Sequence, residues 1–243
     1  MKIIETKDYD ALSRKACEIV LQTLKETEKP VLGLATGSTP EGLYQYLIQA
    51  YQSGEVSFKD VTTFNLDEYV GLDADDPNSY HYFMNDKFID HIDILKENVF
   101  IPNGMAEDIE KECNAYEEKI RTLGPIDLQV LGIGLNGHIG FNEPGTSFSS
   151  RTHMVKLKES TRQANARFFA SIEEVPTHAV TMGIETIMES KEILLLISGS
   201  HKADTLAQLV NGEVSETFPA SVLKNHPNVT LIADEGALEK VNK

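Results

Sequence analysis

The sequence predicts a single α/β domain with an open, mainly parallel sheet that is covered by helices on both faces. Short apolar runs typical of buried strands alternate with longer segments whose apolar residues recur at helical spacing. This alternation is typical of parallel strands joined by crossover helices. No internal repeat, low-complexity tract or long linker divides the chain, so we expect one domain over residues 1–243.

The candidate strands and helices alternate along the chain. The apolar runs predict strands at Val31–Ala35, Val61–Leu66, Asn98–Ile101, Leu128–Ile133, Ala179–Met182, Ile193–Ser198 and Val229–Ala233. Apolar residues at i, i+3 and i+4 predict helices at Pro40–Tyr51, Tyr80–Ile92, Glu107–Leu123 and His201–Asn211. In open parallel sheets, active sites lie where strands end and helices begin, so the motifs at these junctions are the candidates for chemistry.

The charge balance restricts the partners. Asp and Glu number 38 against 22 Lys and Arg, and the formal net charge of -16 is spread along the chain. Such a field repels polyanions, so we expect no nucleic-acid partner. A phosphate site in this chain must therefore rest on a few well-placed donors and cations.

Cysteine usage and hydropathy indicate the compartment. Cys17 and Cys113 lie far apart and belong to no CxxC or Cys/His cluster, as is usual in a reducing compartment. Met1–Asp10 holds no apolar signal region, and no later stretch reaches the ~18 uncharged apolar residues of a membrane span. We therefore expect a cytoplasmic protein with no membrane partner.

The first motif, Gly33–Pro40, predicts a strand that runs into a Gly-Ser-Thr turn at Gly37, Ser38 and Thr39. Thr39 is the expected N-cap of the next helix, with Pro40 at its first position. Free N–H groups, hydroxyls and the helix dipole together form an anion site, although no GxxxxGK[ST] pattern is present. A plain strand-to-helix turn with a good cap explains the same residues.

The second motif, Phe64–Gly71, closes an apolar strand with two adjacent carboxylates, Asp67 and Glu68. Carboxylates at this position either keep a loop soluble or include a catalytic base. The spacing of the polar residues that follow matches no metal site.

The third motif, Leu131–Gly145, is the most informative. It satisfies GxGxxG after a strand, but further glycines and Pro144 leave no room for a dinucleotide-binding helix. What remains is a glycine-rich loop that brings backbone close to a ligand while holding His138 and Glu143 five residues apart. A lone histidine is more often structural, yet the glycines around this pair favour a functional loop.

The fourth motif, Ser198–Lys202, again predicts a strand that runs into a helix, with Ser200 as the expected N-cap. A lysine in the first turn is repelled by the helix dipole, so Lys202 destabilises the helix by roughly a few tenths of a kcal/mol. A bound anion would remove this repulsion. The alternative is an exposed lysine on a tolerant helix. Arg167 is a candidate for a second contact to the anion.

In five segments the chain resembles the glucosamine-6-phosphate deaminase family, in the family's order and over nearly the whole length. The segments are GLATGSTPEGLY, FNLDEYVGL, LGIGLNGHIGFNEPG, TRQANARFF and SGSHKAD. The resemblance implies a Rossmann-like fold and conversion of glucosamine 6-phosphate and water to fructose 6-phosphate and ammonia. It also implies a role in cytoplasmic amino-sugar catabolism, without a metal or an organic cofactor. We expect a sugar-phosphate partner and a monomer or small homo-oligomer.

By this resemblance, Asp67 is the enolisation base that moves a proton between C2 and C1 of the open-chain sugar. His138 catalyses ring opening, and Glu143 and Asn136 orient it. The phosphate ligands would be Gly37, Ser38, Thr39, Arg167 and Lys202.

Two departures from the family pattern carry expectations. Many members have Asp where this chain has Asn136, and an amide cannot balance an imidazolium charge. Relatives that are activated allosterically carry a basic pair where this chain has His153 and Val155, so we expect little or no activation by N-acetylglucosamine 6-phosphate. The segment 143–151, rich in serine, is the expected mobile lid.

Two other functions remain open. A 6-phosphogluconolactonase would also use a histidine in a glycine-rich loop and bind a sugar phosphate, but lactone hydrolysis needs no enolisation base such as Asp67. A sugar-phosphate sensor domain would carry a helix-turn-helix segment and a basic face, and neither is evident in this acidic sequence.

Overall fold

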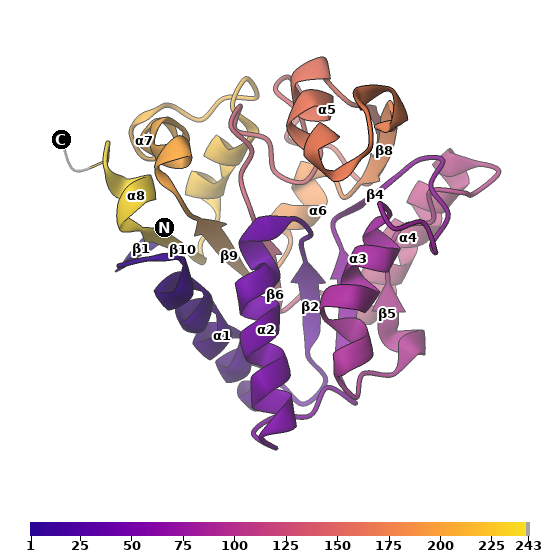
Figure 1. The fold of residues 1–243 in the computed structure, drawn as a ribbon, viewed down its shortest axis with the longest axis vertical. Helices are drawn as coiled ribbons and strands as arrows, with labels where there is room; N and C mark the ends of the chain where they lie inside the picture. The colour runs from indigo at the N-terminus through magenta and orange to yellow at the C-terminus, as the bar shows by residue number, and fades with distance from the viewer. Residues whose placement is uncertain (242–243) are drawn as a thin grey trace.

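In the computed structural model, which describes residues 1–241, seven parallel strands form the main sheet (Figure 1). In sheet order they are β1 (Lys2–Thr6), β10 (Val229–Asp234), β9 (Glu192–Ile197), β6 (Leu128–Leu131), β2 (Val31–Leu34), β3 (Thr62–Asn65) and β5 (Val99–Phe100). A second, antiparallel sheet consists of β4 (Asp67–Tyr69), β8 (His178–Thr181) and β7 (His153–Lys156). The predicted α/β fold with a mainly parallel sheet is confirmed.

Helices cover both faces of the main sheet. The bounds are α1 (Tyr9–Glu26), α2 (Ser38–Gln52), α3 (Tyr80–Lys87), α4 (Ile109–Leu123), α5 (Glu159–Asn165), α6 (Ile184–Met188), α7 (Ala203–Asn211) and α8 (Glu235–Leu238). One apolar core packs α1, α2 and α3 against the sheet, and the other packs α4, α6, α7 and α8 against the opposite face.

The strand sequences follow from this double burial. Along β9, Leu194 and Leu196 enter the core of α1 and α2, whereas Leu195 and Ile197 enter the core of α4 and α7. Because neighbouring side chains point to opposite faces, a strand buried on both sides is expected to be mainly apolar, as β9 is.

Several boundaries differ from the sequence prediction. The run predicted to end at Leu66 stops at Asn65, and the chain then enters β4 in the second sheet. The run predicted at Ala179–Met182 forms β8, which is antiparallel to both of its neighbours. The helix predicted to reach Ile92 ends at Lys87, and a short 3-10 turn follows.

The strand order creates a crevice. From β2 the chain moves outward through β3 to β5, whereas from β6 it moves to β9 on the other side. The loops that follow the neighbouring strands β2 and β6 therefore run in opposite directions from the carboxyl ends of these strands. Ligands bind at such a crevice in open α/β sheets. In Figure 1 the arrow of β2 points to this end, where α5 and the second sheet lie.

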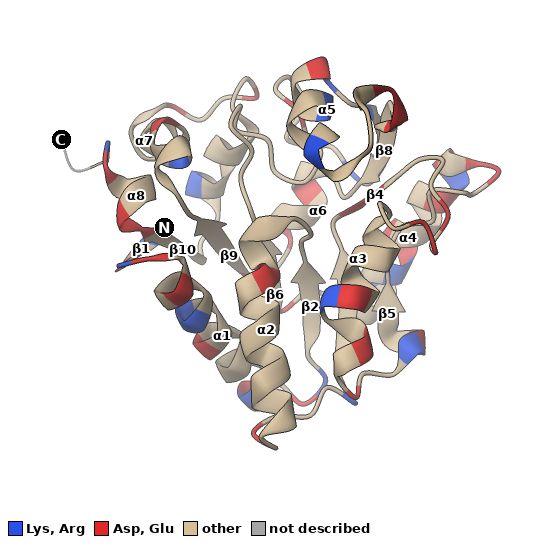
Figure 2. Ribbon diagram, viewed as in Figure 1, with Lys and Arg blue, Asp and Glu red and all other residues tan. Residues whose placement is uncertain are grey.

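Charge is distributed broadly over this fold. Figure 2 shows Asp and Glu on many helices and loops, without one dominant acidic block. Within residues 1–241, no helix has the length and apolar character needed to cross a membrane.

Candidate active site

A cavity of 720 Å³ lies at the carboxyl ends of β2, β3, β6 and β9, within the size range of small-ligand sites. The turn after β2, the start of β4, the loop after β6 and the turn after β9 all contribute to its wall. Of the site residues predicted from the sequence, those that line it are Gly37, Ser38, Thr39, Asp67, Asn136, His138, Arg167 and Lys202. Glu143 lies behind this wall, in contact with Asn136.

The turn after β2 offers unpaired donors to the cavity. The helix α2 begins at Ser38, and Gly37 at its N-cap has a φ of 88°, a conformation that favours glycine. The expected N-cap at Thr39 is therefore wrong, because the N-cap is Gly37, two residues earlier. No side chain caps this end, so the first N–H groups of α2 remain available to an anion.

The turn after β9 brings a lysine to the same cavity. The expected N-cap at Ser200 is wrong, because Ser200–Lys202 form a 3-10 turn and α7 starts at Ala203. Lys202 Nζ donates to the carbonyl of Ile133 at 2.7 Å. Burial, together with the charge of Arg167, lowers the pKa of Lys202 to about 8. A bound phosphate would reverse this shift by balancing the charge.

Asp67 lies where the two sheets meet. It opens β4, pairs with Thr181 of β8, and is 6% exposed on the cavity wall. A Cβ added to Gly140 would lie 3.4 Å from Asp67 Oδ2, so the backbone of the glycine-rich loop passes beside the carboxylate. Burial, and secondarily the charge of Glu68, raise the pKa of Asp67 to about 8. A carboxylate whose pKa is raised to this range can act as a base near neutral pH.

The glycine-rich loop holds an ordered set of three side chains. His138 Nδ1 lies 2.7 Å from Asn136 Oδ1, and Asn136 Nδ2 donates to Glu143 Oε2 at 2.8 Å. The reverse amide orientation would oppose two oxygens at Glu143. Because the amide oxygen only accepts, Nδ1 carries the imidazole proton and Nε2 remains free as an acceptor.

Glu143 supplies the charge that the amide cannot. Its Oε2 lies 3.8 Å from His138 Nδ1 and raises the pKa of the imidazole, while burial and Lys202 lower it. Burial is the largest of these effects, so the pKa of His138 is lowered overall. The Thr161 hydroxyl donates to Glu143 Oε1, a contact that sequence reasoning missed.

The position of the His138 ring requires glycine at residue 134. A Cβ added to Gly134 would lie 2.1 Å from His138 Cε1, so only glycine leaves room for the imidazole. The glycine density of this loop, noted in the sequence, thus has a direct steric cause.

An aromatic wall was not predicted from the sequence. The Tyr69 ring lies 4.8 Å from Tyr80, 5.6 Å from Phe141 and 5.7 Å from Phe169, measured between centroids, and all four rings line the cavity. Asn165 Nδ2 donates to the Tyr69 hydroxyl at 2.9 Å and so ties α5 to β4. These residues come from four separate segments, and no spacing in the sequence indicates that they meet.

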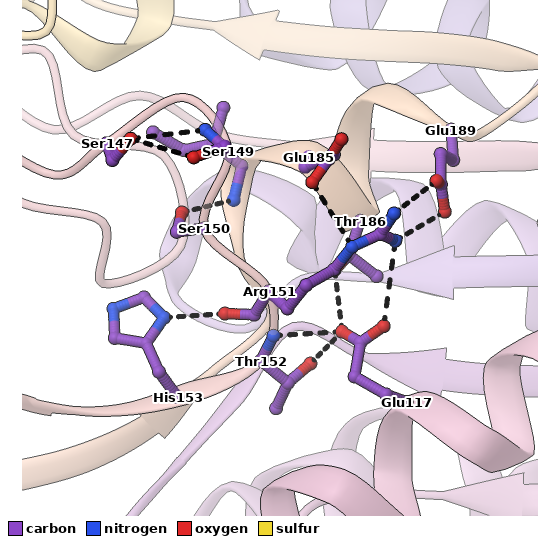
Figure 3. A network of polar contacts seen from close by, with 11 residues as sticks. Glu117, Ser147, Ser149, Ser150, Arg151, Thr152, His153, Glu185, Thr186 and Glu189 are labelled. Carbon is purple, nitrogen blue, oxygen red and sulfur yellow. Dashed lines mark hydrogen bonds and ion pairs between the residues drawn. The ribbon is translucent and has the colours of Figure 1, made fainter.

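The segment 143–151, predicted to be a lid, is held at both ends. Glu143 is fixed by Asn136, and Phe148 N donates to Glu216 Oε1 at 3.0 Å. Arg151 binds Glu189 through two guanidinium nitrogens at 2.6 and 2.5 Å (Figure 3). The lid role of this segment stays a prediction.

Arg151 is surrounded by carboxylates. Besides Glu189, it contacts Glu185 at 3.3 Å and Glu117 at 3.8 Å, and these charges raise its pKa (Figure 3). Glu117 also accepts from the hydroxyls of Thr152 and Thr186 at 2.6 Å. The network therefore joins the end of the segment to α4 and α6, and the arginine is already neutralised.

No cluster of His, Cys, Asp and Glu within residues 1–241 is arranged to hold a metal ion. Cys17 and Cys113 are buried free thiols away from the cavity lining.

Comparison with known proteins gives consistent relatives. The family model described as glucosamine-6-phosphate isomerases/6-phosphogluconolactonase matches residues 6–232. A glucosamine-6-phosphate deaminase of Oceanobacillus iheyensis is 60% identical over 242 residues, covering 100% of this chain and 97% of the relative. Glucosamine-6-phosphate deaminase 1 of Bacillus subtilis is 57% identical over 237 residues, covering 98% of each chain.

Solved structures agree. A structure described as a monomeric glucosamine-6-phosphate deaminase has a TM-score of 0.97 at 56% identity and covers 99% of this chain and 100% of its own. A 6-phosphogluconolactonase of Trypanosoma brucei has a TM-score of 0.82 at 18% identity, with coverage of 99% and 98%, which indicates a shared fold. On the matched length and identity, the chain belongs to the family of glucosamine-6-phosphate isomerases and 6-phosphogluconolactonases.

Proposed function

We propose that this chain converts glucosamine 6-phosphate and water to fructose 6-phosphate and ammonia. The observation that carries the proposal is Asp67, a buried carboxylate on the cavity wall whose pKa is raised to about 8. Moving a proton between carbon atoms needs such a base, whereas hydrolysis of a lactone does not. Relatives that share 56–60% of the sequence over almost the full length carry the deaminase name.

In the proposed reaction His138 opens the sugar ring. Its free Nε2 takes the proton of the C1 hydroxyl and returns a proton to the ring oxygen, which breaks the C1–O5 bond. Asn136 holds Nδ1, and Glu143 at 3.8 Å stabilises the imidazolium that forms in between.

Asp67 then acts on the open chain. It removes the C2 proton of the aldose and delivers a proton to C1. In the same step the carbonyl oxygen at C1 gains a proton and the amino nitrogen loses one, which leaves a hydroxyl at C1 and an imine at C2. Addition of water to this imine releases ammonia and gives fructose 6-phosphate, so all atoms of substrate and water are accounted for. The low exposure of Asp67 keeps its basicity high until the substrate arrives.

The phosphate would be held by the turns after β2 and β9 together with Arg167. Gly37, Ser38 and Thr39 offer the N–H groups and hydroxyls at the start of α2, and Lys202 and Arg167 offer positive charge. Arg167 now stacks on Phe168 at 4.6 Å and lines the cavity beside Lys202. A fixed anchor of this kind positions C1 and C2 for the base.

We further propose a cytoplasmic enzyme that acts as a monomer on a small-molecule sugar phosphate and binds no nucleic acid. The monomeric description of the solved relative supports the assembly, and the formal net charge of -16 supports the absence of a nucleic-acid partner.

A coupled assay tests the function. Wild-type protein is given glucosamine 6-phosphate, and both ammonia and fructose 6-phosphate are measured; a parallel reaction contains 6-phosphogluconolactone. We expect the two products in equal amounts and no acceleration of lactone hydrolysis. Hydrolysis of the lactone without release of ammonia would assign the chain to the lactonase reaction instead.

A further inference from the structure

The buried carboxylate next to Asp67 has no part in the reaction as described. Glu68 is 1% exposed, and in the described residues its only ion-pair partner is the imidazole of His81, with Nδ1 at 2.8 Å. Neighbouring side chains of a strand point to opposite faces, so Glu68 points away from the face that carries Asp67. A buried charge of this kind is costly unless hydrogen bonds compensate it.

Those hydrogen bonds come mainly from the backbone. Glu68 Oε1 accepts from the N–H of Tyr69 at 2.8 Å and of Tyr80 at 3.0 Å, and Oε2 accepts from the N–H of His81 at 2.9 Å. Tyr80 and His81 are the first residues of α3, so the carboxylate occupies the positive end of that helix. Glu68 thus binds the start of α3 to the strand that begins with Asp67.

This attachment fixes an aromatic side chain over the cavity. Tyr80 lines the cavity, packs on Tyr69 at 4.8 Å and stacks on Phe141 at 6.1 Å. Without the carboxylate, two N–H groups at the start of α3 would lose their acceptor, and the helix could shift with its tyrosine.

The same carboxylate acts on Asp67 through its charge. After burial, Glu68 is the charge that raises the pKa of Asp67. The other titratable groups around Asp67 are the phenols of Tyr69, Tyr80 and Tyr116, which are neutral near pH 8. The same cavity is also lined by His138, Arg167, His201 and Lys202, none of which is an acid. Glu68 is therefore the negative charge next to the base.

We propose that Glu68 is a positioning residue for the reaction: it anchors the start of α3, holds Tyr80 over the substrate and places a negative charge beside the base Asp67. The inference rests on the proposed function, because it concerns the same reaction.

The test follows the pH dependence of kcat/KM for glucosamine 6-phosphate in Glu68→Gln. Removing the charge should move the acid limb to lower pH by about one unit, and loss of helix anchoring should lower kcat about tenfold at the optimum. Glu97→Gln removes an exposed carboxylate and serves as the charge-matched control, with an unchanged acid limb. If Glu68 had a purely structural role, the acid limb of Glu68→Gln would coincide with that of the wild type. That result would overturn the proposal.

Glu68→Asp separates the two effects and also serves if Glu68→Gln does not fold. It keeps the charge but withdraws the carboxylate from α3, so we expect the wild-type acid limb with a lowered kcat. Wild-type kcat in this variant would contradict the positioning role. Failure of the wild-type protein to release ammonia would refute the proposed function instead, so the two failures are distinguishable.

Discussion

The side-chain oxygen of Asn136 lies 2.7 Å from Nδ1 of His138, and the nitrogen of the same amide lies 2.8 Å from Glu143. The amide thereby transmits the orientation of the carboxylate to the imidazole, while Glu143 itself is 3.8 Å from Nδ1. Asn136 in place of the aspartate common in the family therefore removes one charge but keeps the hydrogen bond and the proton position.

Replacing Asn136 tests this arrangement. Asn136→Ala leaves the ring unanchored, and we expect kcat to fall about 10- to 100-fold with a smaller change in KM. Asn136→Asp adds a negative charge beside Nδ1, so the pKa of His138, which lies below its ordinary value in the wild type, should rise. NMR titration of His138 measures this. An unchanged titration in Asn136→Asp would show that the side chain at 136 does not face the imidazole.

Asp67 should reduce the stability of the protein at high pH. Its pKa is near 3.8 when unfolded and about 8 when folded, so the folded state binds the proton more tightly and stability falls as pH rises between these values. Asp67→Asn removes this loss. We expect its Tm gain over wild type to be larger at pH 8.5 than at pH 5.5, by about 5 °C or more. A gain independent of pH would contradict the raised pKa.

Phosphate binding should involve proton uptake by Lys202. Because its pKa in the free protein is about 8, the lysine is largely neutral at pH 9, and a bound anion restores its charge. Calorimetry with inorganic phosphate in buffers of different ionisation enthalpy should show uptake of protons at pH 8–9, with affinity falling above pH 8. Lys202→Gln should remove the uptake and weaken binding by about 10- to 100-fold. Lys59→Gln, an exposed lysine at the other end of β3, is the control; equal uptake in the Lys202 variant would refute the assignment.

The network around Arg151 predicts little or no response to an anionic effector. Glu117, Glu185 and Glu189 already neutralise this arginine, and His153 and Val155 stand where activated relatives carry basic residues (Figure 3). An anionic effector would meet an excess of negative charge there. We expect a hyperbolic rate curve that N-acetylglucosamine 6-phosphate does not change. A sigmoidal curve that the compound sharpens would contradict this.

Much of the fold could be predicted because most sheet strands are buried on both faces. The predicted runs at β6, β9 and β10 agree with the structure to within two residues, since these strands are mainly apolar. By contrast, β1 is a partly exposed edge strand with charged residues, and β4 has three residues whose pairing with β8 is non-local. Local patterns carry no signal for such strands.

The candidate site was predictable to the extent that strand ends meet in a parallel sheet. Motifs after β2, β6 and β9 could be expected to share one cavity, and the structure places them there. The contact of Thr161 with Glu143 and the anchoring of α3 by Glu68 join segments that are distant in sequence. Only the folded chain shows these contacts, because no motif spacing encodes them.

The most direct test of the central claim is the release of ammonia by Asp67→Asn, measured beside wild type with saturating glucosamine 6-phosphate. The amide keeps the shape of the side chain but cannot accept the C2 proton, so we expect kcat to fall at least about 10³-fold. Binding of inorganic phosphate, measured by calorimetry, should stay within about twofold of wild type, because the anchor at α2 and Lys202 is unaltered. Ammonia release at the wild-type rate by this variant would contradict the assignment of Asp67 as the base.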